Sequence, residues 1–311
     1  MRARRLDLFA LFLAALAAGC LLRNRPDEVT RFADTDESHA VATMRIVDPV
    51  RKDAHLAVLW IGHATVLLQL DDRFILTDPW FTENAGQVSH RLHPPGLDAK
   101  HLPPLDAILV SHMHFDHLSI DSLELLEKKT PRLFVPEGGS VYIPNLAFAT
   151  KELGTWQSWE KDGLRITAVP VDHIGWRYGI DQEWMTKSFT GYVIEYHGLT
   201  VYFSGDTAYA QEKFRATAAR FPHIDLALLP IGPIHPRSFM SRVHTDPDEA
   251  LRAFADLGAK TMVPIHFDTL VNSTDARGEE RLTLADLVQK RGLGDRVKTL
   301  RIGEQCVIMA R

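Results

Sequence analysis

One short segment concentrates the side chains that could do chemistry. Residues 111–117, Ser-His-Met-His-Phe-Asp-His, place the imidazoles of His112, His114 and His117 and the carboxylate of Asp116 within six positions. A loop can turn such closely spaced side chains toward one point, whereas a helix or a long strand cannot. Imidazole nitrogen mixed with carboxylate oxygen suits Zn(II). We therefore predict a metal site here, in preference to a solvated polar loop.

The elements around this segment predict an α/β fold. The segment follows an apolar run at 107–110 that is typical of a buried strand, and Ser119 can cap a helix over 119–129. Hairpins followed by alternating strands and helices favour two mixed sheets flanked by helices. Strands are expected at 56–61, 65–70, 73–77, 107–110, 132–135, 164–171, 190–195, 200–204, 226–229, 261–265 and 305–309, and further helices at 208–220, 247–257 (capped by Asp246) and 282–290.

Further short motifs accompany the histidine loop. They stand at 60–65, 77–79, 134–136, 205–207, 230–232 with 236–237, 244–247 with 249–250, and 265–266. Together, from about Trp60 to Leu270, they resemble the metallo-β-lactamase-fold hydrolases, and among these the branch of phospholipases D that hydrolyse N-acylphosphatidylethanolamine. The resemblance implies a metallo-β-lactamase-type αβ/βα sandwich with a two-metal centre at one edge of the two sheets.

The same resemblance implies a set of seven metal ligands. It assigns His112, His114 and His173 to the first metal, Asp116, His117 and His266 to the second, and Asp206 to the bridge between them. Each of these residues stands just beyond an expected strand. That agreement is independent of the family, because a two-metal site needs ligands delivered from rigid strand ends at one sheet edge.

Zinc is the expected metal, two ions per chain. Iron-using relatives tend to have Glu where this chain has His114, and this difference favours zinc. Iron or manganese is the alternative. Two divalent ions that share a water lower its pKa toward neutrality, so a metal-bridging hydroxide is the expected nucleophile and no covalent protein nucleophile is required. Asp116 is expected both to hold a metal and to orient this hydroxide.

Two residues outside the ligand set are candidates for contacting the substrate. Arg177 matches an arginine of the phospholipase branch and could hold a phosphate; the alternative is a surface arginine paired with acidic neighbours. His244 is a candidate substrate contact or proton donor to the leaving oxygen; the alternative is a histidine that merely precedes a helix. His63 stands in a turn between two expected strands, and we interpret it as structural.

The leading hypothesis is a phosphodiesterase that acts on an N-acylated phospholipid and releases phosphatidic acid and an N-acylethanolamine. Aromatic residues at 176–178 and Trp184 could meet lipid, or could equally belong to the core. One alternative is a lactonase or another small-ester hydrolase of the same fold, which the metal centre alone does not distinguish. A non-catalytic metal-binding lipoprotein is the other alternative, and the complete ligand set disfavours it.

The charge balance argues against a nucleic-acid partner. The 311 residues carry 35 basic and 40 acidic side chains, and beyond residue 20 the balance is 32 against 39, a net charge of −7. Binding to a phosphate backbone depends instead on clustered Lys and Arg. We therefore expect a small-molecule or phospholipid substrate. The two cysteines, Cys20 and Cys306, provide neither a disulfide framework nor a thiolate metal cluster.

The N-terminus is expected to be a targeting leader. Basic residues 1–5 precede the apolar run 8–22, which is short for a membrane span, and 16–20 (Leu-Ala-Ala-Gly-Cys) resemble the bacterial lipoprotein signal. We expect a leader at 1–22, an arm or tether at 23–54 and the hydrolase domain at 55–311. A lipidated Cys20 would anchor the protein in the bacterial cell envelope; an uncleaved anchor or secretion is the alternative, and a leader without function would leave the protein cytoplasmic.

Overall fold

A computed structural model describes residues 45–86, 89–178 and 187–311. The expected leader, most of the expected arm, and Trp184 lie outside these residues and stay predictions. Residues 45–53 of the arm are described, and the backbone N–H of Arg51 donates to Oε1 of Gln69 at 2.8 Å. Within the described ranges, no helix is long and apolar enough to cross a membrane.

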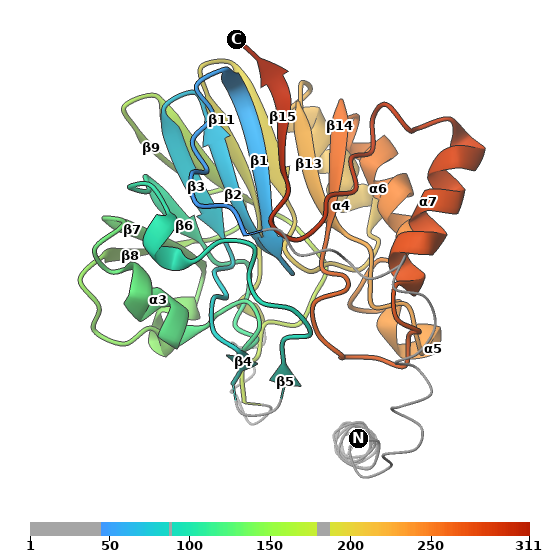
Figure 1. Cartoon of the computed structure of the whole chain (residues 1–311), viewed down its shortest axis with the longest axis horizontal. Helices are drawn as coiled ribbons and strands as arrows, with labels where there is room; N and C mark the ends of the chain where they lie inside the picture. The colour runs from blue at the N-terminus through green and yellow to red at the C-terminus, as the bar shows by residue number, and fades with distance from the viewer. Residues whose placement is uncertain (1–44, 87–88, 179–186) are drawn as a thin grey trace. The chain divides into compact units, whose positions relative to one another are not determined.

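Two mixed sheets form the centre of the described chain (Figure 1), as predicted. The larger sheet has the order β15-β1-β2-β3-β6-β7-β8, the smaller has the order β14-β13-β12-β11-β10-β9, and β4 pairs with β5 separately. The strands are β1 (Ala54–Gly62), β2 (Thr65–Leu70), β3 (Arg73–Thr77), β4 (Asn84–Ala85), β5 (Ser89–His90), β6 (Ala107–Leu109), β7 (Arg132–Pro136), β8 (Ala149–Leu153), β9 (Ser158–Lys161), β10 (Leu164–Val169), β11 (Gly191–Tyr196), β12 (Leu199–Phe203), β13 (Leu226–Pro230), β14 (Thr261–Ile265) and β15 (Gln305–Ala310).

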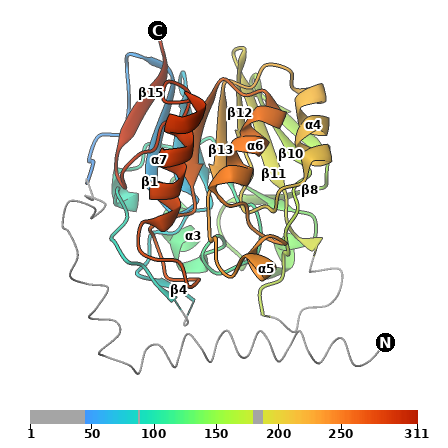
Figure 2. The same ribbon diagram turned by 90° about the vertical axis from the view of Figure 1, so that its right-hand side faces the viewer.

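Side-chain caps start two of the helices, at Ser119 and at Asp246. In α6, Asp246 accepts from the backbone of Glu249, the Glu249 side chain accepts in return, and Gly258 ends the helix in the left-handed conformation, so the predicted range is confirmed. Figure 2 shows α7, α6 and α4 side by side, and α6 packs against β13. The helices are α3 (Ile120–Leu126), α4 (Gln211–Arg220), α5 (Arg237–Met240), α6 (Pro247–Leu257) and α7 (Glu279–Arg291), with 3-10 turns η3 (Ala99–His101) and η4 (Gly139–Tyr142).

Strand β1 contributes side chains to two hydrophobic cores. Val58 and Trp60 belong to the core that also contains β10 to β14, whereas Leu59 and Ile61 belong to a second core that contains Leu123 of α3. Successive residues of a strand point to opposite faces, so both faces of β1 are buried. This explains why the sequence of β1 is a continuous apolar run rather than an alternating one.

Two acidic side chains, Asp275 and Glu280, contact the loop after β13. The carboxylate of Asp275 accepts from the backbone N–H groups of Ile234 and His235, each at 2.6 Å. Glu280 of α7 is buried against Gly232, where an added Cβ would lie 2.8 Å from Cγ of Glu280. Burial, together with nearby carboxylates, raises the pKa of Glu280 to about 8.

Because the pKa of Glu280 is raised, ionising this side chain at higher pH lowers the free energy of unfolding, and Glu280→Gln should remove this loss. In the unfolded chain the carboxyl ionises near 4.5, so between that pH and about 8 the folded state binds the extra proton and the free energy of unfolding falls as pH rises. The stability of the variant relative to wild type, measured by urea denaturation, should therefore increase from pH 4.5 to 8.5. The exposed Glu124→Gln is the control, and a pH-independent difference for Glu280→Gln would contradict the assignment.

Candidate metal centre

The predicted ligands leave the two sheets at strand ends that share one edge. His112 follows β6, His173 follows β10, Asp206 follows β12 and His266 follows β14. Because β12, β13 and β14 are parallel, the residues after β12 and β14 emerge on the same side. A bridge between His112 and Phe189, just before β11, joins the histidine loop of one sheet to the other sheet.

The Asp206 carboxylate lies at the middle of the site. Its side chain is buried, and five imidazole nitrogens lie 3.0 to 3.9 Å from one of its oxygens. Measured from Oδ2, these nitrogens are Nε2 of His266 at 3.0 Å, Nε2 of His117 at 3.2 Å, Nδ1 of His244 at 3.6 Å, Nε2 of His112 at 3.9 Å and Nε2 of His173 at 3.9 Å.

The remaining ligands fall into the two predicted sets. In each set, one nitrogen or oxygen per residue lies within 4.8 Å of the corresponding atoms of the other members, which is close enough for a shared metal ion. The first set is His112, His114 and His173, and the second is Asp116, His117 and His266 joined by His63. The structure thus brings all seven residues of the predicted ligand set together.

The buried atoms of the site fit a metal ion. Nε2 of His117, His173 and His266 and Oδ1 of Asp206 are buried and have no hydrogen-bond partner in the described part of the chain. Buried polar atoms without partners are costly and rare. Imidazole nitrogens and carboxylate oxygens are the donors that zinc prefers in catalytic sites. The site therefore has the unsatisfied donors and the chemistry that two metal ions would complete.

The other ring nitrogen of each of these histidines has a partner that fixes the ring. Nδ1 lies 2.7 Å from Oδ2 of Asp78 in His117, 2.8 Å from the carbonyl oxygen of Val243 in His173, and 3.1 Å from that of Gly232 in His266. A carbonyl oxygen can only accept, so Nδ1 donates in His173 and His266. This leaves Nε2 unprotonated and directed at the centre, the tautomer that binds metal.

Asp78 was not predicted as a site residue, although it lies in one of the recognised motifs. Its buried carboxylate accepts from the backbone N–H and the hydroxyl of Ser111, each at 2.6 Å, as well as from His117. Gly205 lets the loop of Asp206 approach the same serine, because a Cβ there would lie 2.2 Å from Cβ of Ser111. Asp78 therefore fixes both ends of the histidine loop.

His63 has a larger role than the structural one predicted. It occupies the expected turn between β1 and β2, with φ of 56°. Its buried side chain reaches into the site, where Nε2 lies 2.9 Å from Oδ2 of Asp116. Its carbonyl oxygen also accepts from the backbone N–H of His266 at 3.1 Å. His63 thus orients a ligand of the second set and supports another.

The electrostatics of the polypeptide favour a cation at the centre. Burial alone would raise the pKa of Asp206, but the facing imidazoles of His117 and His266 lower it well below its usual value. Burial and neighbouring imidazoles lower the pKa of His114 to about 3. Ionised carboxylates surrounded by mostly neutral imidazoles are the protonation state in which such a set binds metal.

Arg177 contacts the histidine loop. Its NH1 donates to the carbonyl oxygens of Met113 at 2.9 Å and Leu118 at 2.8 Å, and its Cζ lies 4.2 Å from the ring centre of Phe115. The sequence predicted a phosphate contact or a surface ion pair with acidic neighbours. These contacts give Arg177 a part in holding the backbone of the loop, and the phosphate contact stays a prediction.

The remaining candidates lie beside the centre. His244 stands next to Asp206, with Nδ1 3.6 Å from Oδ2, so it lies beside the predicted metal ligands, where a substrate contact is expected. Tyr178 is 62% exposed and its ring is 5.8 Å from that of Phe115, while Trp176 is half-buried. Tyr178 is therefore a surface residue near the histidine loop rather than a core residue.

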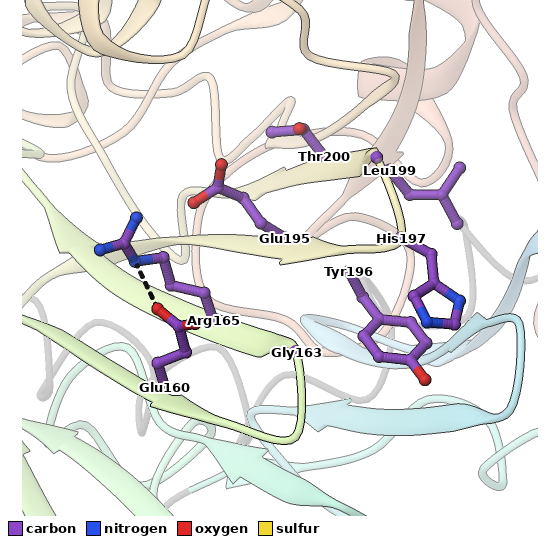
Figure 3. Close-up of a pocket in the computed structure, with 9 residues that line it drawn as sticks. Glu160, Gly163, Arg165, Glu195, Tyr196, His197, Leu199 and Thr200 are labelled. Carbon is purple, nitrogen blue, oxygen red and sulfur yellow. Dashed lines mark ion pairs between the residues drawn. The ribbon is translucent and has the colours of Figure 1, made fainter.

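A cavity of about 220 Å³ lies away from this centre (Figure 3). Its lining residues stand at the start of β10, next to Gly163, at the end of β11, at Tyr196, and at the start of β12, at Leu199. The metal-centre residues follow the other ends of β10 and β12. At the cavity, Nε of Arg165 lies 3.5 Å from Oε2 of Glu160. The cavity is therefore no part of the metal centre.

Comparisons with known proteins agree with this architecture. Residues 73–267 match the family described as Beta-lactamase superfamily domain. The chain is 31% identical over 261 residues to N-acyl-phosphatidylethanolamine-hydrolyzing phospholipase D 1 of Caenorhabditis elegans, covering 78% of this chain and 73% of that protein. It is also 31% identical over 229 residues to a metal-dependent hydrolase of Exiguobacterium, covering 68% of this chain and 86% of that protein. Some other curated relatives are longer, and the chain spans 54 to 65% of their length.

A solved structure shows the same fold. Igni18, a metallo hydrolase of the archaeon Ignicoccus hospitalis, superimposes with a TM-score of 0.62 at 22% identity, covering 81% of this chain and 97% of that one.

The contacts of Arg177 predict that Arg177→Ala weakens metal binding. Each hydrogen bond from a charged donor is worth about 1.5–3 kcal/mol, and a loosened histidine loop should lower zinc affinity by roughly tenfold or more. Competition with a chelator measures this affinity, and Arg165→Ala at the distant cavity is the control. Unchanged zinc affinity combined with selective loss of lipid turnover would instead support the phosphate contact predicted from the sequence.

Proposed function

The chain belongs to the beta-lactamase superfamily and is a metal-dependent hydrolase, and we propose that it is a zinc phosphodiesterase that cleaves phospholipids of the N-acylphosphatidylethanolamine type. The observation that carries the proposal is the 31% identity to a phospholipase D named for that activity, over 78% of the chain. The proposal is also supported by the predicted ligand set, whose side chains lie around Asp206 in this chain.

The residues of the site suit hydrolysis of a phosphodiester. Two bound divalent ions would supply an activated water and Lewis acidity at the phosphate. The hydrogen bond from His63 fixes the carboxylate of Asp116, which can then orient the attacking water and take up its proton. His244, beside Asp206, is the candidate to contact the substrate or to protonate the leaving oxygen.

Apolar side chains around the site support a lipid substrate. Two of them belong to segments that also carry metal-centre residues: Ile174 follows His173, and Val271 lies beyond His266 in the same loop. The backbone N–H of Leu92 donates to the carbonyl oxygen of Thr269 in that loop. Exposed apolar side chains that gather around a polar centre suit acyl chains or a lipid surface. The exposed fractions are 36% for Ile174, 62% for Tyr178, 46% for Phe239, 69% for Val271 and 40% for Leu92.

We expect the purified protein to contain close to two zinc ions per chain, because the ligands divide into two sets around Asp206. His112→Ala and His266→Ala each remove a ligand from one set and should each lower the zinc content toward one. Elemental analysis measures this, with the exposed His197→Ala as control. Iron in place of zinc, or unchanged metal content in both site variants, would refute the assignment.

The substrate class is tested on a panel that contains N-acylphosphatidylethanolamine, a small activated phosphodiester, a lactone and a carboxylic ester. We expect water to cleave the P–O bond that joins the phosphate to the N-acylethanolamine, giving phosphatidic acid and N-acylethanolamine. Asp116→Asn should lower this turnover by roughly 100- to 10,000-fold, the usual worth of a proton-transfer group, whereas Arg165→Ala should not. Strong lactone hydrolysis with little lipid turnover would indicate a lactonase, and free fatty acid as the product would end the phosphodiesterase proposal.

A further inference from the structure

His244 shares two properties with the histidines of the ligand set. Its Nδ1 is buried, and it has no hydrogen-bond partner within the described residues, as is also true of Nε2 of His117, His173 and His266. Its side chain is only 13% exposed. A histidine that served only to meet substrate from the solvent side would not need to bury this nitrogen against the metal ligands.

The position of Nδ1 fits a metal ligand. It lies 3.6 Å from Oδ2 of Asp206, inside the range of 3.0 to 3.9 Å that the predicted ligand histidines show to the same oxygen. Two atoms bound about 2.0–2.2 Å from one zinc at a tetrahedral angle are separated by roughly 3.3–3.6 Å. At 3.6 Å the nitrogen is also too far from the carboxylate for a direct hydrogen bond.

The neighbours of His244 point to the second metal. Its ligand atom lies within 4.8 Å of those of Asp206 and His266, which makes these three residues a candidate ligand group of their own. Its ring stacks on that of His266, with centres 5.2 Å apart and an angle of 27° between the planes. With Asp116 and His117, the second metal would then have five protein ligands instead of four.

The backbone holds His244 in this place. Its N–H donates to the carbonyl oxygen of Met240 at 2.7 Å, and its own carbonyl oxygen accepts from NH1 and NH2 of Arg237, each at 3.1 Å. Arg237 is in turn paired with Asp246 and Glu249 at the start of α6. A ligand needs this kind of fixed backbone, because metal affinity depends on the pre-set direction of the donor atom.

We infer that His244 is an eighth protein ligand, which binds the second metal through Nδ1 when no substrate is present. The inference rests on the zinc centre proposed above and not on the identity of the substrate. It assigns to the resting protein a metal ligand that neither the sequence motifs nor the resemblance provided.

The test counts metal-bound histidines directly. In the full chain loaded with Co(II) and labelled with ¹⁵N-histidine, a ring N–H acquires a large contact shift only when its imidazole is bonded to the metal. The predicted set contributes five such signals, from His112, His114, His117, His173 and His266. With His244 as a ligand, we expect six signals in the wild type and five in His244→Phe, which keeps a ring in the buried space but removes both nitrogens.

A second measurement and a control separate ligation from packing. Competition with a chelator should show the weaker-bound metal of His244→Phe losing at least the 10- to 100-fold in affinity that even an outer-shell change costs. His197→Phe, an exposed histidine far from the centre, should leave the count and the affinity unchanged.

The outcomes distinguish this inference from the proposed function. Five signals in wild-type protein that holds two cobalt ions would overturn the inference alone, and the wild-type count decides even where a variant fails to fold. Protein that binds neither zinc nor cobalt would overturn the proposed metal centre itself. Failure to hydrolyse the phospholipid, with six signals present, would overturn only the proposed substrate.

Discussion

The buried carboxylate of Asp206 is the constraint on which the rest of this site depends. An ionised carboxylate removed from water is costly unless opposite charge or strong hydrogen bonds compensate it. Here its neighbours are imidazoles, which lie 3.0 to 3.9 Å away, and four of them have a buried nitrogen without a hydrogen-bond partner among the described residues. Such a group favours positive charge at its centre, which the metal ions of the proposed centre would supply.

The two sheets meet this constraint through their strand ends. Parallel pairing places the residues after β12 and β14 on one edge, and the bridge between His112 and Phe189 ties the histidine loop to the other sheet. The rings are then fixed from behind by Asp78 and by carbonyl oxygens. Because Asp78 and Gly232 stand just after β3 and β13, these partners are held by strands of the two packed sheets.

Apart from the distant ligands that the resemblance provided, the sequence predicted what is local and missed what depends on distant contacts. The closely spaced loop of His112, the strands that precede the ligands and the cap of α6 all follow from neighbouring residues. The hydrogen bond between His63 and Asp116 joins residues 53 positions apart, and that between Asp78 and His117 joins residues 39 apart. No local pattern encodes such pairs. The edge strands β8 and β9 escaped prediction because they are short and polar, with side chains that are mostly exposed.

Arg237 shows that stability and site geometry depend on the same bonds. Its guanidinium binds the carbonyl oxygen of His244 and also pairs with Asp246 and Glu249, the two residues of the capping box that starts α6. Between His244 and Asp246, the hydroxyl of Thr245 donates to the carbonyl oxygen of Pro230, the last residue of β13, at 2.6 Å. The first turn of α6 therefore cannot fray without releasing the segment that places His244 beside Asp206. The bonds that cap this helix therefore also hold this side of the metal centre.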